Sequence, residues 1–333
     1  MKYNFLPDRA TLAAMVDAFR GKLQDSYRKL LTTIHEETGY KQAKTILENI
    51  EALPRKNFSS ILTFYYHHTV RAINEGEEDI PKLLSDLDRV LSFVKEEGNN
   101  GLFIVYEAMP DTIAHAILRT MGHSITNYNI ALRGLPQTEE LKAKQRLEQG
   151  VKYLQHNCPK ALVSVQELVH QIFFVGSDCP ENHYTLALTG VVTQGMVFIN
   201  AEKNTDWVSL LDKYVHEAAP AYLFLINQEE LLVLNDPKRL YPSPVRHDMR
   251  PMEGVYHAVF VLMRLLYTFS MILEDSSLVE SDKKDIVSLI KTYSDSLEKG
   301  YDTVMEQGEL TQVARILLEE GYESIHAFSR AEK

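Results

Sequence analysis

The stretch DWVSLLDKYVHEAAPAYLFLIN, residues 206–227, sets the interpretation of this chain of 333 residues. Apolar and aromatic residues recur in it at spacings of three and four, which is the pattern of an amphipathic helix. Asn204, Thr205 and Asp206 come just before the pattern, and residues of these types cap helix N-termini. We therefore predict a helix that begins close to Asp206.

His216 and Glu217 form the first half of a metal-binding pattern on this helix. In the sequence His-Glu-x-x-His, two imidazoles one turn apart bind one metal ion, and the Glu between them moves protons. The apolar stripe centres near Leu211 and Ala218, so His216 lies on the opposite side of the helix. Pro220 stands where the second histidine would be. It offers no metal ligand and removes a helical hydrogen bond to the carbonyl of residue 216, so we expect a kink there.

The second decisive stretch is RPMEGVYHAVFVLMRLLY, residues 250–267. Its proline and glycine predict a helix start close to residue 252, and the residues that follow are apolar on every face, as in a buried helix. His257 lies in the first turn of this helix. The loop before it carries Arg246, His247 and Asp248. The pattern therefore brings a titratable ring into the interior at the end of a charged loop.

Together these residues resemble a known enzyme family. The segment Arg250-Pro251-x-x-Gly254-Val255-x-His257-Ala258 follows a His-Glu helix and a loop with Pro244 and Arg246. This arrangement resembles the HExxH-type α-ketoglutarate-dependent peptide β-hydroxylases, which modify ribosomally made peptides. The resemblance covers the chain after about residue 180 and includes Glu309-Leu310-Thr311.

The resemblance implies an Fe(II) ion bound by His216 and His257, with α-ketoglutarate as co-substrate and O2 as oxidant. Arg250, and after it Arg246, matches the arginine that pairs with the distal carboxylate of α-ketoglutarate, a role that suits a planar guanidinium. Glu217 matches the catalytic carboxylate of the motif. The implied reaction is hydroxylation of a Cβ in a precursor peptide.

Pro220 leaves the third iron ligand unassigned. Glu217 could turn inward as a carboxylate ligand, His247 or Asp248 could supply the ligand from the loop, or the site binds no metal. In the last case the chain is a degenerate relative that binds peptide as a scaffold or partner protein. A third interpretation is a zinc peptidase with Glu217 as general base, which leaves the arginine loop unexplained.

Composition limits the other function classes. The length allows two domains, and 45% hydrophobic residues can fill a sizeable core. The formal net charge is −11, and without a basic block we expect no nucleic-acid partner. Cys158 and Cys179 are the only cysteines, which is typical of a reducing cytoplasm. The apolar run Tyr256–Leu273 is interrupted by polar residues, so we predict a core helix and no membrane association.

The chain order predicts a mainly α fold with a small β-sheet in its C-terminal half and a zincin-like active-site helix. We expect an N-terminal helical region at 1–133 and an HExxH-like catalytic region at 134–333, divided at Gly134-Leu135-Pro136. The predicted helices are one from near Arg9, then Tyr40–Leu53, Phe58–Asn74, Ile80–Lys95, Ala108–Met121, Glu139–Gln155, Ser281–Leu297 and Thr311–Glu320, with Gly300, Gly308 and Gly321 as breaks. The predicted strands are Tyr184–Leu188, Val191–Ile199 and a short third at Leu231–Leu234. An exposed edge of this sheet could add a peptide as a further strand.

Overall fold

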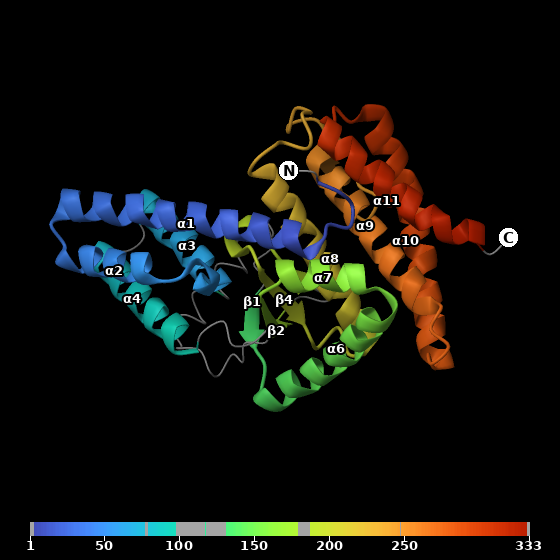
Figure 1. Cartoon of the computed structure of the whole chain (residues 1–333), viewed down its shortest axis with the longest axis horizontal. Helices are drawn as coiled ribbons and strands as arrows, with labels where there is room; N and C mark the ends of the chain where they lie inside the picture. Colours follow the sequence, from blue (N-terminus) through green and yellow to red (C-terminus); the bar gives the residue numbers. More distant parts are fainter. Residues whose placement is uncertain are drawn as a thin grey trace. The chain divides into compact units, whose positions relative to one another are not determined.

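The computed structural model describes residues 3–76, 79–97, 117, 131–178, 187–246 and 248–331. Helices dominate this part of the chain and a small sheet accompanies them, so the predicted fold class is confirmed (Figure 1). The chain divides into two compact units, each assembled from separate segments. Unit 1 comprises Met1–Leu12, Gln145–Glu167 and Asp206–Lys333, and unit 2 comprises Ala13–Lys144 and Leu168–Thr205.

The units do not follow the contiguous regions 1–133 and 134–333 expected from the sequence. Gly134-Leu135-Pro136 instead joins a strand that ends at Gly134 to a helix, α6 (Gln137–Asn157). The division falls inside α6: its residues up to Lys144 belong to unit 2 and those from Gln145 onward belong to unit 1, although the helix is continuous there. A change of packing partner inside a helix needs no glycine or proline, so the sequence carries no breaker signal for it.

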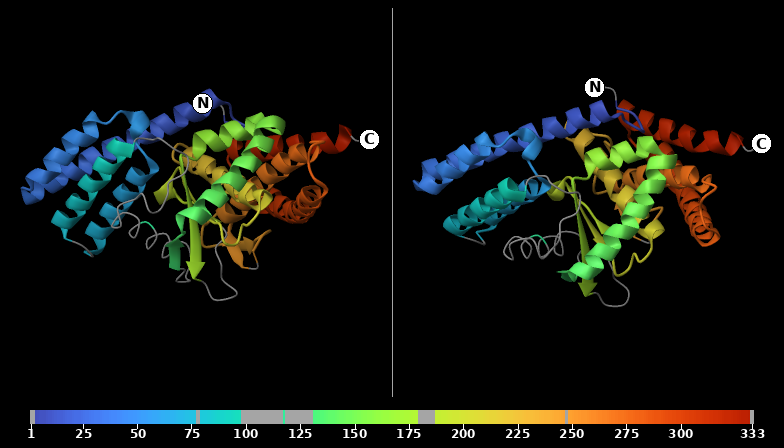
Figure 2. Two further views of the ribbon diagram at one scale, coloured as in Figure 1. Left: turned by 90° about the horizontal axis from the view of Figure 1, so that it is seen from below. Right: turned by 60° about the horizontal axis from the view of Figure 1, so that its bottom comes forward.

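Unit 2 contains a group of helices and a sheet. The helices are α1 (Arg9–Thr38, whose first residues belong to unit 1), α2 (Lys41–Ala52), α3 (Ser60–Glu75) and α4 (Ile80–Glu97), and they confirm the helices predicted in this range (Figure 2). Their apolar faces share one core, in which the buried Tyr27 donates its hydroxyl proton to the carbonyl of Leu62 at 2.7 Å. The helix predicted at Ala108–Met121 lies outside the described residues except for position 117.

The sheet of unit 2 has the strand order β1-β2-β4-β3. Its strands are β1 (Ala131–Gly134), β2 (Gln171–Asp178), β3 (Ala187–Leu188) and β4 (Met196–Asn200). The central pair β2 and β4 is parallel, and Phe173 and Phe198 stack with ring centroids 5.1 Å apart. The predicted pairing of two strands before the His-Glu helix is confirmed by β3 and β4, although Val191–Thr193 forms a 3-10 turn.

Unit 1 is built around α9 (Met252–Leu273), which packs against the other helices of its C-terminal part. These helices are α8 (Trp207–Asn227), α10 (Glu280–Gln307) and α11 (Gln312–Ala331). A two-stranded hairpin, β5 (Leu240–Pro242) and β6 (Met249–Pro251), packs on α9 and α10. By length and composition α9 could span a bilayer, but 72% of its apolar window is buried inside the unit. Its place in the core agrees with the prediction.

The segment before α1 is attached to unit 1 by specific contacts. The ring of Phe5 packs edge-on against Phe260 with centroids 5.7 Å apart. The backbone amide of Phe5 donates to Glu320 Oε2 at 2.9 Å, and Tyr222 donates its hydroxyl proton to the carbonyl of Asn4 at 3.1 Å. Residues near the beginning of the chain therefore complete a core formed largely by α8, α9 and α11.

Several sequence expectations for unit 1 are wrong. Gly300 and Gly321 lie inside α10 and α11, where a Cβ on Gly300 would approach Val259 Cγ2 to 2.8 Å and one on Gly321 would approach Met263 Sδ to 2.7 Å. These two positions need glycine because there is no room for a side chain; the glycines do not break the helices. Gly308 does end α10. Leu231–Leu234 forms only an isolated bridge between Val233 and Leu310.

Candidate functional site

The predicted helix around His216 is present and begins as expected. Asp206 accepts a hydrogen bond from the backbone amide of Ser209 at 2.8 Å, and Ser209 completes a reciprocal capping box. The helix continues through Pro220, which is buried in its interior. The position of the second motif histidine is therefore occupied by a side chain that packs and offers no donor atom.

His216 on α8 and His257 on α9 lie close enough to influence each other. Burial is the main reason that the pKa values of both imidazoles are lowered to about 4. At His216 the charges of Lys213, His257 and Arg246 act in the same direction, and that of Asp212 acts in the opposite one. Each residue keeps some accessible surface, but protein atoms surround both rings, and Phe224 packs edge-on against His257 with ring centroids 5.8 Å apart. Both imidazoles are therefore neutral at neutral pH, with a free electron pair available on one nitrogen.

Asp212 lies one turn before His216 on the same side of α8 and is 2% exposed. Its Oδ1 accepts a hydrogen bond from the hydroxyl of Tyr293 on α10 at 2.6 Å, and its Oδ2 accepts one from the ammonium of Lys213. The carboxylate thus has a cationic partner, Lys213 on α8, and a hydroxyl partner, Tyr293 on α10.

Glu217 points into a buried environment and is 6% exposed. Burial raises the pKa of its carboxyl to about 8, the nearby Asp212 raises it as well, and Lys213 and Arg246 act in the opposite direction. At neutral pH most of this carboxyl is therefore protonated. In that state it can donate a hydrogen bond but cannot act as a base.

The two candidate arginines have different surroundings. Arg246 lies in the turn of the β5–β6 hairpin, has no ion pair within the described residues, and lowers the pKa values of His216 and Glu217 through its charge. Arg250 on β6 forms an ion pair with Asp248 at 2.9 Å. The structure therefore brings Arg246, the second choice from the sequence, into electrostatic contact with the site.

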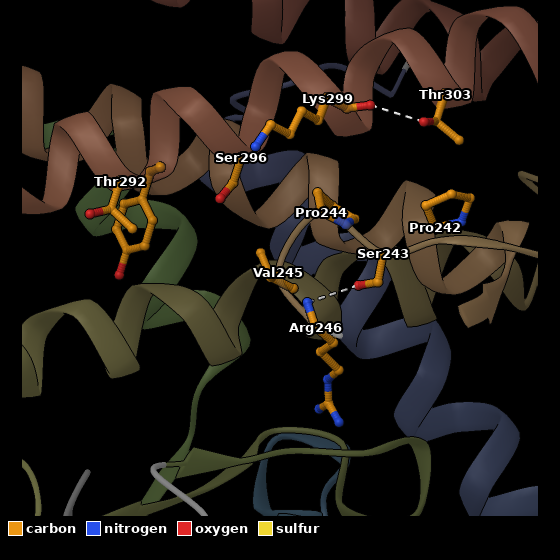
Figure 3. Close-up of a pocket in the computed structure, with 10 residues that line it drawn as sticks. Pro242, Ser243, Pro244, Val245, Arg246, Thr292, Ser296, Lys299 and Thr303 are labelled. Atoms are coloured by element: carbon orange, nitrogen blue, oxygen red, sulfur yellow. Dashed lines mark hydrogen bonds between the residues drawn. The ribbon is translucent and has the colours of Figure 1, made fainter. Parts of the chain in front are cut away.

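A pocket of about 460 Å³ opens between the hairpin and α10 (Figure 3). Tyr293 lines this pocket and is also the residue that donates to Asp212. Arg246 belongs to the pocket wall, but its guanidinium points away from the row of α10 side chains (Figure 3). Asp212 on α8 is thus connected to a surface opening through Tyr293.

The residues in the described part of the chain do not fit a three-ligand iron site. A 2-His-1-carboxylate or three-histidine site requires three donors directed at one point. Among the described residues, no three His, Cys, Asp or Glu side chains are grouped so that they could hold a metal ion. Asp248 is paired with Arg250, and His247 lies outside the described residues. His216 and His257 remain as a pair.

Sequence reasoning missed Asp212, Lys213 and Tyr293. Asp212 could have been found, because it precedes His216 by one turn and interrupts an apolar stripe. Tyr293 could not, since it lies 81 residues away from Asp212 along the chain. Known proteins do not narrow the assignment: no family model and no curated protein matches this chain.

Proposed function

We propose that this protein binds peptide at the α8–α9 site, as a relative of the HExxH-type peptide hydroxylases without their three-ligand metal centre. The observation that carries the proposal is Pro220, buried inside a continuous α8 at the position of the second histidine. The peptide as ligand comes from the resemblance of the Arg250–His257 segment. The role is that of a scaffold or partner protein in peptide modification.

The groups around Pro220 support binding without a metal. Arg246 supplies a positive charge, and the neutral Glu217 supplies a buried hydrogen-bond donor. The two neutral imidazoles of His216 and His257 can each donate and accept one hydrogen bond. A peptide backbone offers complementary donors and acceptors to all of these groups.

Hydroxylation of a peptide Cβ with Fe(II), α-ketoglutarate and O2 is the second candidate function. One observation favours it: His216 and His257 come from neighbouring helices, lie close together and are neutral, as metal ligands must be. It requires a third ligand, either Glu217 after deprotonation or His247. A zinc peptidase requires the same third ligand, and the raised pKa of Glu217 weakens its role as general base.

Anaerobic titration of the chelator-treated protein with Fe(II) and α-ketoglutarate separates these functions. We expect the wild-type protein to develop no visible charge-transfer band of iron-chelated keto acid. We expect Pro220→His to bind Fe(II) more tightly, because it restores two imidazoles one turn apart. His257→Ala in the Pro220→His background should remove that gain.

A charge-transfer band in the wild-type protein, together with succinate formation when peptide and O2 are added, would replace the proposal with the oxygenase. His257→Ala would then be expected to abolish iron binding while circular dichroism stays unchanged. If Pro220→His brings no gain in Fe(II) affinity, the backbone around α8 has diverged from the geometry of the motif.

A further inference from the structure

The β5–β6 hairpin exposes apolar side chains on one face. In its register Leu240 lies opposite Pro251 and Pro242 opposite Met249, so these residues share a face. Leu240 and Met249 are each 51% exposed, whereas Tyr241, on the other face, is 2% exposed and packs inward. Val245 in the turn is 50% exposed. Exposed apolar side chains gathered on one small element mark an interaction surface.

The apolar face continues into the pocket beside α10. Pro242 belongs to both, since it lines the pocket between the hairpin and α10. In Figure 3 the side chains of Ser296 and Lys299 reach from α10 into the same space as Pro244 and Val245 of the hairpin. A peptide bound on the apolar face of the hairpin could therefore place an adjoining side chain in the pocket, close to Lys299.

The positive charge of the pocket favours an acidic ligand. Lys299 and Arg246 are the charged residues in its wall, and the other residues that line it are hydroxyl-bearing or apolar. Lys299 has no ion pair in the part of the chain that the structure describes, whereas the charge of Arg246 acts on the carboxyls of Glu217 and Asp248. The chain as a whole carries a formal charge of −11, so this positive opening differs in sign from the protein around it.

We propose that the hairpin face and the pocket bind a peptide segment in which an acidic side chain adjoins apolar ones. The carboxylate meets the ammonium of Lys299 and the hydroxyl of Ser296, and the apolar side chains cover Leu240, Pro242 and Met249. A free small acid would use the pocket but leave the apolar face uncovered. This inference rests on the proposed peptide-binding function and names the class of peptide.

A selection with random peptides displayed on phage, against the immobilised protein, tests the inference. Binding peptides should be enriched in Asp or Glu next to Leu, Ile, Val or Phe. Fluorescence anisotropy of the strongest peptide should then show a loss of about tenfold in affinity for Lys299→Gln, because a charge-assisted hydrogen bond is removed. Met249→Ser should weaken the same peptide severalfold.

Matched variants control for general surface effects. Lys291→Gln removes an exposed charge of α10 that does not line the pocket, and Leu231→Ser removes an apolar side chain that is 62% exposed outside the hairpin. Neither should change peptide affinity. Glutarate, a free dicarboxylate, should compete only weakly, and its binding should not depend on Met249.

The outcomes separate this inference from the function on which it rests. Enriched peptides without acidic residues, or affinity unchanged by both Lys299→Gln and Met249→Ser, would overturn the inference and leave peptide binding intact. Glutarate binding as tight as the peptide would assign the pocket to a free acid and also overturn it. Failure to enrich any peptide would overturn the proposed function together with the inference.

Discussion

Two buried charged groups in unit 1, Asp212 on α8 and Arg264 on α9, are stabilised in opposite ways. Asp212 has a cation and a hydroxyl as partners, from Lys213 and Tyr293. Arg264 has one hydrogen bond, from its Nη1 to Ser164 Oγ at 3.2 Å, and its Nε and Nη2 atoms have none in the described part of the chain.

Aromatic faces take the place of an acid around Arg264. Its guanidinium carbon lies 5.0 Å from the ring centre of Phe5, 5.7 Å from that of Tyr222 and 5.2 Å from that of Phe260. Burial lowers the pKa of Arg264 to about 10, and the charges of Tyr222, Cys158 and Tyr267 act in the opposite direction. Asp212 is thus paired with a cation and linked to a pocket through Tyr293. Arg264 has aromatic rings around it and no acidic partner in the described part of the chain.

The largest expected effect comes from Asp212→Ala. It leaves the ammonium of Lys213 and the hydroxyl of Tyr293 without their acceptor, so we expect a loss of about 3–5 kcal/mol in the free energy of unfolding. Trp207, the only tryptophan of the chain, lies on α8 and reports the unfolding of unit 1 in urea by its fluorescence. The control Asp295→Ala, on the exposed face of α10, should change stability by at most about 0.5 kcal/mol. Equal effects of the two variants would show that Asp212 is not a structural partner.

Arg264→Met should have the opposite sign. Methionine fills a similar volume without a charge, so the protein should gain about 1–3 kcal/mol in the free energy of unfolding. The same tryptophan signal measures the gain, and Arg315→Met on the exposed side of α11 serves as control. A loss of stability would mean that the three rings outweigh the desolvation of the guanidinium, and the contrast with Asp212 would disappear.

Glu217→Gln sharpens the comparison through pH. The folded-state pKa of Glu217 is about 8 against an ordinary 4.5, so its contribution to stability is full at low pH and is lost as pH rises through 8. His216 and His257, with pKa values lowered from 6.5 to about 4, act in the opposite direction at acidic pH, where they destabilise the fold.

Metal-free wild-type protein should therefore be most stable near pH 6.5 as far as these three groups decide. Between pH 6.5 and 8 it should lose about 1 kcal/mol in the free energy of unfolding, because the loss from Glu217 exceeds the remaining gain from the two histidines. Glu217→Gln should remove that decline, whereas the exposed control Glu306→Gln should keep it. Urea titrations at a series of pH values give the measurement. A decline of equal size in Glu217→Gln would assign it to other groups.

The smallest effect is expected at the N-terminus of α8. Asp206→Ala removes the cap of the helix that carries Asp212, so it should lower the free energy of unfolding by about 1 kcal/mol. Asp206→Asn keeps a capping side chain and should lower it far less. If alanine and asparagine behave alike, the capping box does not contribute to the stability of α8.

Local signals in the sequence predicted the helices that carry the site. Asp206 and Pro251 mark the starts of α8 and α9 by capping and by proline chemistry, both of which depend on neighbouring residues alone. Strand β2 was missed because it is buried on both faces, which leaves no alternation to detect. The hairpin was missed because its strands are three residues long and contain prolines at positions that read as loop.

The candidate site was predicted in part. His216, Glu217, His257 and Arg246 lie in one unit, and the charge of Arg246 acts on the pKa values of His216 and Glu217. The partner of Asp212 comes from α10, and the pocket is formed by two elements that are distant in sequence. Contacts of this kind depend on tertiary packing, and a single sequence contains no local pattern that reveals them.

The attachment of Phe5 to unit 1 has a consequence for how the protein is made. All segments of unit 2 have been translated once residue 205 has left the ribosome, so this unit can fold during synthesis. Phe5 is translated before unit 2 is complete, but its partners Phe260, Arg264 and Gly321 all follow residue 205. The segment around Phe5 therefore cannot make all of these contacts until Gly321 has been translated, and it reaches them after unit 2 is able to fold.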